Sequence, residues 1–73
     1  MSWYLRALEQ PDGSWLPRFG LTDFPVQPDE TTVLAFLVTT ATELGGREMF
    51  RFYLHRRDGT IETRLATDPV SGD

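Results

Sequence analysis

The sequence contains no cysteine and only one histidine, His55. No disulfide can therefore stabilise the 73-residue chain, and a structural zinc site would lack its usual ligands. We expect no metal and no other cofactor. A chain of this length buries only about 60% of the surface that its unfolded state exposes, so association with a partner is the remaining way to add stability.

Long apolar runs are missing as well. Residues 1–6 show no basic run followed by an apolar stretch, and no segment has the roughly 20 apolar residues of a membrane-spanning helix. We expect neither a secretory signal nor a membrane anchor, and therefore a cytoplasmic protein. Glycine-rich phosphate loops, nucleophile and base motifs, and metal-ligand spacings are absent too, which indicates a protein that is not an enzyme.

Lysine is also absent, so all seven basic side chains are arginine, and their distribution is uneven. Residues 19–46 contain four acidic side chains and no basic one, whereas residues 47–64 contain five arginines and three acidic side chains. The net charge is −4 and the isoelectric point is about 4.7. An acidic middle and a basic end permit complementary association between copies, while the net negative charge opposes long-range attraction to nucleic acid.

Turn-forming residues at positions 10–14 predict a first hairpin between residues 3 and 21. Pairing residue 10 with residue 14 sets Ala7 opposite Pro17. Alternation then places six apolar side chains on one face, namely Trp3, Leu5, Ala7, Trp15, Pro17 and Phe19. Because proline has no N–H, we expect the strand that contains Pro17 to lie at an edge of the sheet or to be bulged.

A helix is predicted from Asp29 to Leu44. Before it, residues 20–28 contain Pro25 and Pro28, which oppose regular structure and predict an irregular connection. The helix begins with negative charge and ends at two consecutive glycines, as helices commonly do. Its apolar side chains recur at helical spacing and form one core-facing stripe of Val33, Leu34, Leu37, Val38, Ala41 and Leu44.

A second hairpin is predicted after the helix. Alternation over residues 48–57 indicates a strand, and the Asp-Gly pair at positions 58–59 predicts a two-residue loop into a last strand over residues 61–66. This register sets Phe52 opposite Leu65 on one face and His55 opposite Glu62 on the other. A histidine beside a carboxylate can act as a base with its orienting group, but a cross-strand surface pair explains the same two residues.

The resulting order, ββαββ, predicts an α+β fold in which one helix packs on one face of a four-stranded, largely antiparallel sheet. Residues 1–66 are expected to form a single domain. Residues 67–73 contain turn formers and no apolar pattern, so we expect a flexible C-terminal tail there.

The second face of such a sheet would be uncovered. The candidate interaction surface on this face and the basic hairpin consists of Tyr4, Leu16, Arg18, Arg51, Tyr53, His55, Arg56 and Arg64. We predict a protein-interaction module that forms a homodimer through the uncovered face or an edge strand. The alternative is a nucleic-acid-binding accessory protein that uses the basic C-terminal hairpin, because tyrosine and arginine stack on bases and neutralise phosphates.

The segment from Phe52 to Ile61 contains the run His-Arg-Arg-Asp-Gly-Thr-Ile. It resembles the closing hairpin of a family of short bacterial domains of unknown function, in which a tryptophan-containing hairpin and one helix come first. Trp15, the helix and the run at residues 55–61 occur here in that order. The resemblance implies the same order of elements and assigns no catalytic residue.

Overall fold

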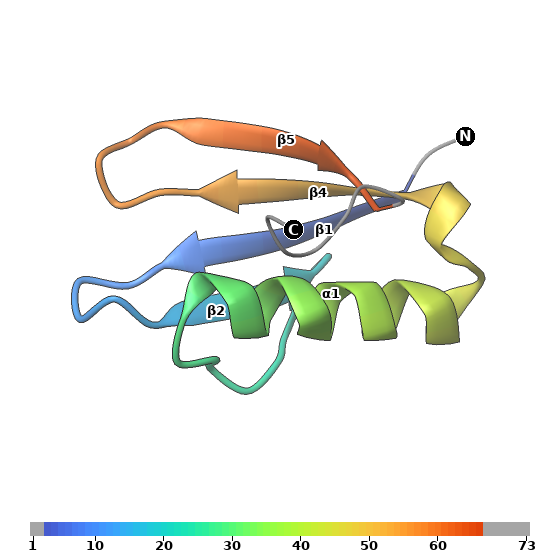
Figure 1. Ribbon diagram of the computed structural model, residues 1–73, viewed down its shortest axis with the longest axis horizontal. Coiled ribbons are helices and arrows are strands. Elements are labelled where there is room, and N and C mark those ends of the chain that lie inside the picture. Colours follow the sequence, from blue (N-terminus) through green and yellow to red (C-terminus); the bar gives the residue numbers. More distant parts are fainter. Residues whose placement is uncertain (1–2, 67–73) are drawn as a thin grey trace.

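The computed structural model describes residues 3–66, which form one helix and a five-stranded sheet (Figure 1). The strands are β1 (Trp3–Glu9), β2 (Trp15–Phe19), β3 (Thr22–Asp23), β4 (Phe50–His55) and β5 (Ile61–Leu65). Helix α1 (Glu30–Leu44) packs against one face, and a short 3₁₀ turn, Arg47–Met49, leads from it into β4. The α+β class is therefore confirmed. The predicted tail, residues 67–73, lies outside the described residues.

The sheet is mixed, so the prediction of four largely antiparallel strands is wrong in its detail. The strand order is β3-β2-β1-β4-β5, and β1 and β4 run parallel at its centre, with Leu5 opposite Phe52. Helix α1 explains this direction, because it carries the chain back to the end of the sheet at which β1 begins (Figure 1). Strand β4 then starts beside the start of β1 and follows it, as strands joined by a helical crossover do.

The predicted register of the first hairpin is confirmed, with Ala7 opposite Pro17. The N–H of Gln10 donates to the carbonyl of Ser14 at 2.8 Å. Since bonding positions alternate along an antiparallel pair, residues 16 and 18 of β2 also direct their backbone groups toward β1. Pro17 falls between these positions, so its missing N–H points away from β1 and costs no bond there. The expectation of an edge or a bulge is wrong, because β3 follows on the outer side of β2.

The prolines of residues 20–28 predicted an irregular connection. The structure instead has the short strand β3 within this segment. This strand is only two residues long and pairs Thr22 with Phe19 and Asp23 with Arg18. Gly20, at a φ of 61°, makes the tight turn from β2. The N–H of Phe24 then donates to the carbonyl of Pro17 at 2.9 Å, so the proline still accepts a bond on its outer side.

The predicted register of the second hairpin is wrong by one residue. The N–H of Arg56 donates to the carbonyl of Thr60 at 2.9 Å, and Gly59 has a φ of 93°, so the loop has three residues rather than two. His55 consequently pairs with Ile61, and Leu54 pairs with Glu62. A shift of one residue moves every side chain of a strand to the other face. Strand β5 therefore turns Glu62 toward the helix side.

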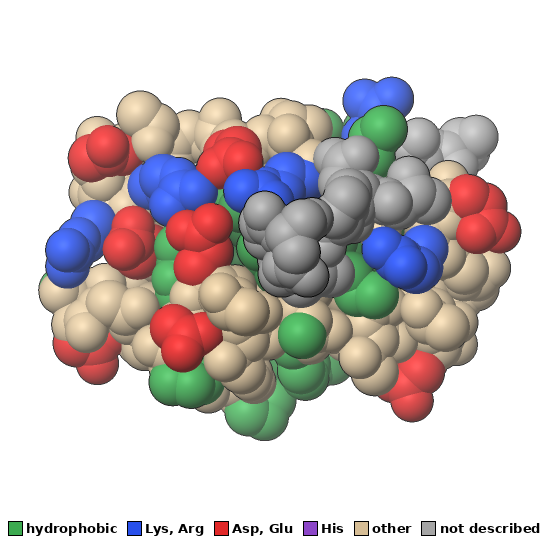
Figure 2. Space-filling model, in the orientation of Figure 1, with side chains coloured by type: hydrophobic (Ala, Val, Ile, Leu, Met, Phe, Trp, Pro, Cys, Tyr) green, Lys and Arg blue, Asp and Glu red, His purple; other side chains and the backbone are tan. Residues whose placement is uncertain are grey.

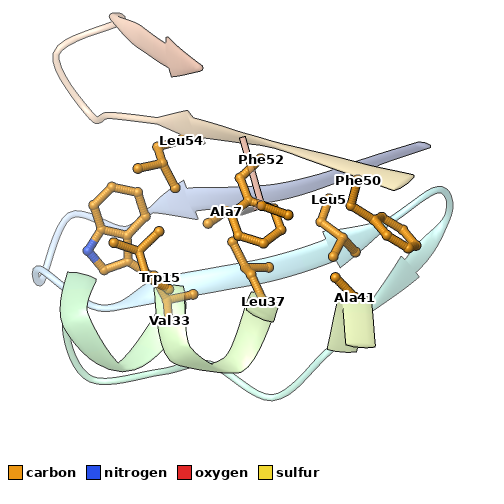
Figure 3. Close-up of a cluster of buried hydrophobic side chains, with 11 residues drawn as sticks. Leu5, Ala7, Trp15, Val33, Leu37, Ala41, Phe50, Phe52 and Leu54 are labelled. Atoms are coloured by element: carbon orange, nitrogen blue, oxygen red, sulfur yellow. The ribbon is translucent and has the colours of Figure 1, made fainter. Parts of the chain in front are cut away.

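The core lies between the sheet and one stripe of α1, as the helical spacing predicted (Figure 3). Asp29 caps the helix by accepting a hydrogen bond from the N–H of Thr32 at 2.8 Å, and Gly45 ends it. Two predicted core positions differ, because Trp3 and Leu44 are 48% and 51% exposed. The buried apolar residues are Leu5, Ala7, Trp15, Pro17, Val33, Leu34, Leu37, Ala41, Phe50, Phe52, Leu54 and Ala66.

Candidate functional site

The face of the sheet opposite α1 is covered by no helix within residues 3–66, and we call it the open face. Alternation along each strand decides which side chains reach it. The register brings together Tyr4, Arg6 and Leu8 from β1, Leu16 and Arg18 from β2, Arg51, Tyr53 and His55 from β4, and Ile61, Thr63 and Leu65 from β5.

Apolar and aromatic side chains make up much of the open face. Tyr4 and Tyr53 lie against each other, with ring centroids 5.1 Å apart and planes inclined by 33°. Tyr4, Ile61 and Leu65 are each about half exposed, at 49%, 59% and 51%. Exposed apolar side chains that share one face make the open face a candidate binding surface.

The charged side chains of the open face are mainly arginines. Arg18 forms an ion pair with Asp23 across β2 and β3, with Nε and Oδ1 2.6 Å apart. Arg6 and Arg51 form no ion pair within the part of the chain that the structure describes. This face is therefore positively charged, although the whole chain has a net charge of −4.

Six of the eight predicted surface residues lie together on the open face, namely Tyr4, Leu16, Arg18, Arg51, Tyr53 and His55. The other two, Arg56 and Arg64, do not. Arg64 pairs across the ladder with Phe52 and so belongs to the helix side. Arg56 follows β4 and places its guanidinium 5.7 Å from the ring centroid of Trp15, a buried core residue. The prediction that these two lie on one surface with the other six is wrong: the register of β5 turns Arg64 to the helix side, and Arg56, which directly follows His55, lies on that side by alternation.

Arg56 and Arg64 instead form an ion-pair cluster with two glutamates. Arg56 lies 2.8 Å from a carboxylate oxygen of Glu30 in α1 and 2.6 Å from one of Glu62 in β5, and Arg64 lies 2.8 Å from Glu62. Figure 2 shows acidic and basic side chains interleaved over the second hairpin and the start of the helix. The hydrogen bond from Arg56 holds the pKa of Glu62 below its usual value, and the two carboxylates raise the pKa of Arg56.

The cluster changes the interpretation of the basic hairpin. Arg56 and Arg64 are compensated by carboxylates of the same chain, and Arg57 lies 3.8 Å from Glu9. A phosphate backbone would have to compete with these carboxylates for the same guanidinium groups. The cationic surface is therefore the open face and not the hairpin.

His55 lies on the open face and forms no ion pair with a carboxylate of residues 3–66. Its cross-strand neighbour is Ile61, and its Nε2 is buried with no hydrogen-bond partner within residues 3–66. Together with Arg6, Tyr53 and Ile61 it lines a shallow hollow of about 220 Å³. The register thus removes the base and carboxylate pair that a His55–Glu62 neighbourhood would have supplied.

Burial lowers the pKa of His55, and the positive charge of Arg6 lowers it further. The folded state therefore favours the neutral imidazole, so its stabilisation is present above the ordinary pKa of about 6.5 and is lost as pH falls toward the folded-state value. Glu62 affects stability at a lower pH. Because its pKa is lowered in the folded state, the ionised carboxylate stabilises the fold, and this stabilisation is lost as pH falls from about 4.5 through the folded-state value.

We expect the unfolding free energy to decline in two steps on acidification, the first beginning below about pH 6.5. In the His55→Gln variant the first step should be absent and the decline below about pH 4.5 should remain. Urea denaturation followed by tryptophan fluorescence across this pH range measures both. An unchanged first step in the variant would show that another group causes it.

The sequence interpretation missed Ile61, Thr63 and Leu65 as members of the open face. The signal that could have found them is the likeness of the two loops. Asp12 accepts hydrogen bonds from the N–H and hydroxyl of Ser14, at 3.0 and 2.6 Å, and Asp58 accepts the same two from Thr60, at 2.9 and 2.7 Å. Two Asp-Gly-Ser/Thr loops of equal length imply equal registers.

The described residues contain neither a metal-binding cluster nor a membrane-spanning helix. Residues 3–66 bring together no group of three or more histidine or carboxylate side chains that could hold a metal ion. Helix α1 is too short and too polar to cross a membrane, and it is the longest helix in that part of the chain.

Comparison of the chain with family models, with curated proteins and with solved structures finds no match. The resemblance of the closing hairpin to a family of short bacterial domains therefore stays a prediction. The open face has to be interpreted from its own geometry and charge.

Proposed function

We propose that this protein is a non-enzymatic protein-interaction module, acting in the cytoplasm, whose open face binds a protein segment that carries carboxylates among apolar side chains. The observation that supports it is the coexistence of exposed Tyr4, Ile61 and Leu65 with Arg6 and Arg51, which have no carboxylate partner within residues 3–66. A partner that buries the apolar groups and pairs the arginines satisfies both features at once.

A second copy of the chain bound face to face fits this surface poorly. It would place Arg6 and Arg51 of one copy near arginines of the other, and like charges across an interface oppose association. Two copies could not bring only their apolar side chains together, because on the open face of β1 and β4 these side chains alternate with the arginines. Complementary charge therefore favours a different, acidic partner for the open face.

Single-stranded nucleic acid is the second candidate, on one specific observation. The Tyr4–Tyr53 pair beside Arg6 and Arg51 resembles the combination of stacking surface and cations that binds unpaired bases. Against it stand the net charge of −4 and the compensation of the hairpin arginines by Glu30, Glu62 and Glu9. We therefore place it after the acidic protein partner.

Selection from a library of random peptides on the immobilised protein tests the proposal. We expect selected peptides to be rich in aspartate, glutamate and large apolar residues. Their affinity should fall at least about tenfold in the Arg6→Glu and Arg51→Glu variants, since each reverses a charge that the peptide must match. The matched control is Arg57→Glu, which reverses an exposed arginine on the hairpin loop and should change affinity little.

Two results would contradict the proposal. The first is a set of selected peptides without acidic enrichment, or with affinities that all three variants leave unchanged. The second is submicromolar binding of a single-stranded oligonucleotide at physiological salt that is lost in Arg51→Glu and Tyr53→Ala, which would place nucleic acid first.

A further inference from the structure

An apolar groove runs along the C-terminal half of α1, on the flank of the helix next to β2 and β3. It consists of two hollows of about 290 Å³ each. Three threonines line the first hollow together with Phe19, Phe24, Phe36, Glu43 and Leu44. The second is lined by Trp3, Phe19, Leu44, Met49 and Phe50. Because Phe19 and Leu44 line both hollows, the two adjoin and can hold parts of one ligand.

The local structure brings three phenylalanines to the first hollow. Strand β3 sets Thr22 opposite Phe19, and the N–H of Phe24 donates to the carbonyl of Pro17 at 2.9 Å, which holds Phe24 at the outer edge of the sheet. The chain then passes along α1 to the first turn of the helix (Figure 1). The rings of Phe24 and Phe36 have centroids 5.5 Å apart and planes inclined by 60°. All three phenylalanines are only partly buried, so aromatic surface is accessible to a ligand.

The carboxylate of Glu43 is the only charged group that lines the groove within the described part of the chain, and it forms no ion pair there. The other acidic side chains of residues 19–46 are engaged elsewhere. Asp23 and Glu30 form ion pairs with arginines, and Asp29 caps α1. Glu43 is therefore the uncompensated charge of the acidic segment.

The end of α1 adds to this negative charge. The last carbonyl groups of a helix carry a partial negative charge that basic side chains usually offset, but the last turn of α1 contains none. Arg47, which follows the helix, donates from Nε to the carbonyl of Ala66 at 2.9 Å. The groove thus combines apolar and aromatic walls with a negative potential.

We propose that the groove binds a small amphiphilic cation, in which a quaternary ammonium group carries an apolar chain. The ammonium group would lie in the first hollow, since cations are attracted to the faces of aromatic rings and to a carboxylate such as that of Glu43. The chain would lie in the second hollow, against Trp3 and Met49.

The chemistry of the walls favours an alkylated ammonium group. A primary ammonium has three N–H groups that need acceptors, whereas a quaternary ammonium has none, so aromatic rings and one carboxylate are sufficient for it. Each hollow is close to the lower limit of about 300 Å³ for ligand pockets, which suits a small molecule.

This inference goes beyond the proposed function, because the groove and the open face share no residue. Trp3 and Phe50 lie on the helix side of the sheet, on the same side as Leu5 and Phe52. Binding at the groove and binding at the open face can therefore be tested separately.

Titration of the full chain with hexyltrimethylammonium, followed by two-dimensional ¹H–¹⁵N NMR, tests the inference. We expect a dissociation constant of about 1 mM or tighter, with the largest shifts at the amides of Phe19, Thr22, Glu43 and Leu44. Tetramethylammonium, the head group alone, and 1-hexanol, a neutral chain of the same length, should each bind at least about fivefold more weakly. Hexanesulfonate, which has the same chain and a negative head group, should bind the groove at least about tenfold more weakly.

Three variants at exposed or half-exposed side chains separate the two hollows. Glu43→Gln should weaken hexyltrimethylammonium by about fivefold or more and leave 1-hexanol within about twofold, because it removes only the charge. Glu48→Gln is the matched control, since it changes the net charge equally outside both hollows and should alter either affinity less than about twofold. Met49→Gln should weaken hexyltrimethylammonium by about threefold or more and leave tetramethylammonium unchanged, because Met49 lines only the second hollow.

Three results would overturn the inference. One is hexyltrimethylammonium binding that is no tighter than that of 1-hexanol, or that shifts amides outside the groove. Another is a Glu43→Gln variant that binds the cation as tightly as the Glu48→Gln variant. The last is a peptide with one trimethylated lysine that binds at least about tenfold more tightly than hexyltrimethylammonium, which would make the occupant a protein side chain and not a free small molecule.

Discussion

Replacing Leu37 by alanine should lower the unfolding free energy by about 2–5 kcal/mol. Leu37 is fully buried at the centre of the helix stripe and points toward Phe52 of the sheet (Figure 3). The shortened side chain would leave a cavity that neither element can fill, since β4 is held on both sides by neighbouring strands. Chemical denaturation followed by tryptophan fluorescence measures the loss.

Leu44→Ala is the matched control for this prediction. It makes the same substitution in the same helix at a side chain that is 51% exposed, so we expect a loss below about 1 kcal/mol. Comparable losses in the two variants would mean that the buried stripe of α1 faces a different direction.

Replacing Leu54 by alanine should also cost about 2–5 kcal/mol, whereas Leu65→Ala should cost less than about 1 kcal/mol. Leu54 is fully buried on the helix side of β4, and Leu65 lies on the open face of β5 with 51% of its surface exposed. The comparison separates the two possible registers of the second hairpin. A two-residue loop would set Leu65 opposite Phe52, in the core, and make it as costly to truncate as Leu54.

Losses of similar size for Leu54→Ala and Leu65→Ala would contradict the three-residue loop. They would also return Glu62 to the open face beside His55.

The register of the first hairpin could be predicted and that of the second could not, although their loops are alike. In the first, Pro11 and Gly13 indicate a three-residue loop, and the large apolar side chains on either side permit only one register. In the second, an Asp-Gly pair is compatible with two loop lengths, and residues 61–65 alternate an apolar set with a charged set. Either set could face the helix, so local pattern does not decide between the two.

The candidate site was predictable to the extent that its strands were. Along β1 and β4 the large apolar side chains face the helix. Alternation alone therefore places the side chains between them on the open face, namely Tyr4, Arg51, Tyr53 and His55. The side on which Glu62 and Arg64 lie depends on the register of β5. A single step of that register exchanged two charged side chains for Ile61 and Leu65 and changed the chemistry of the surface.

The sequence by itself determined the helix and the four longer strands, because each depends on contacts between residues close along the chain. Apolar spacing marks α1, the Asp29 cap and Gly45 bound it, and alternation marks the long strands. Only the tertiary structure decided that β1 and β4 run parallel and that Glu30 in α1 meets Arg56 beyond β4. These relations join residues far apart in sequence, and they follow from how the helix and all the strands pack together, which no local pattern encodes.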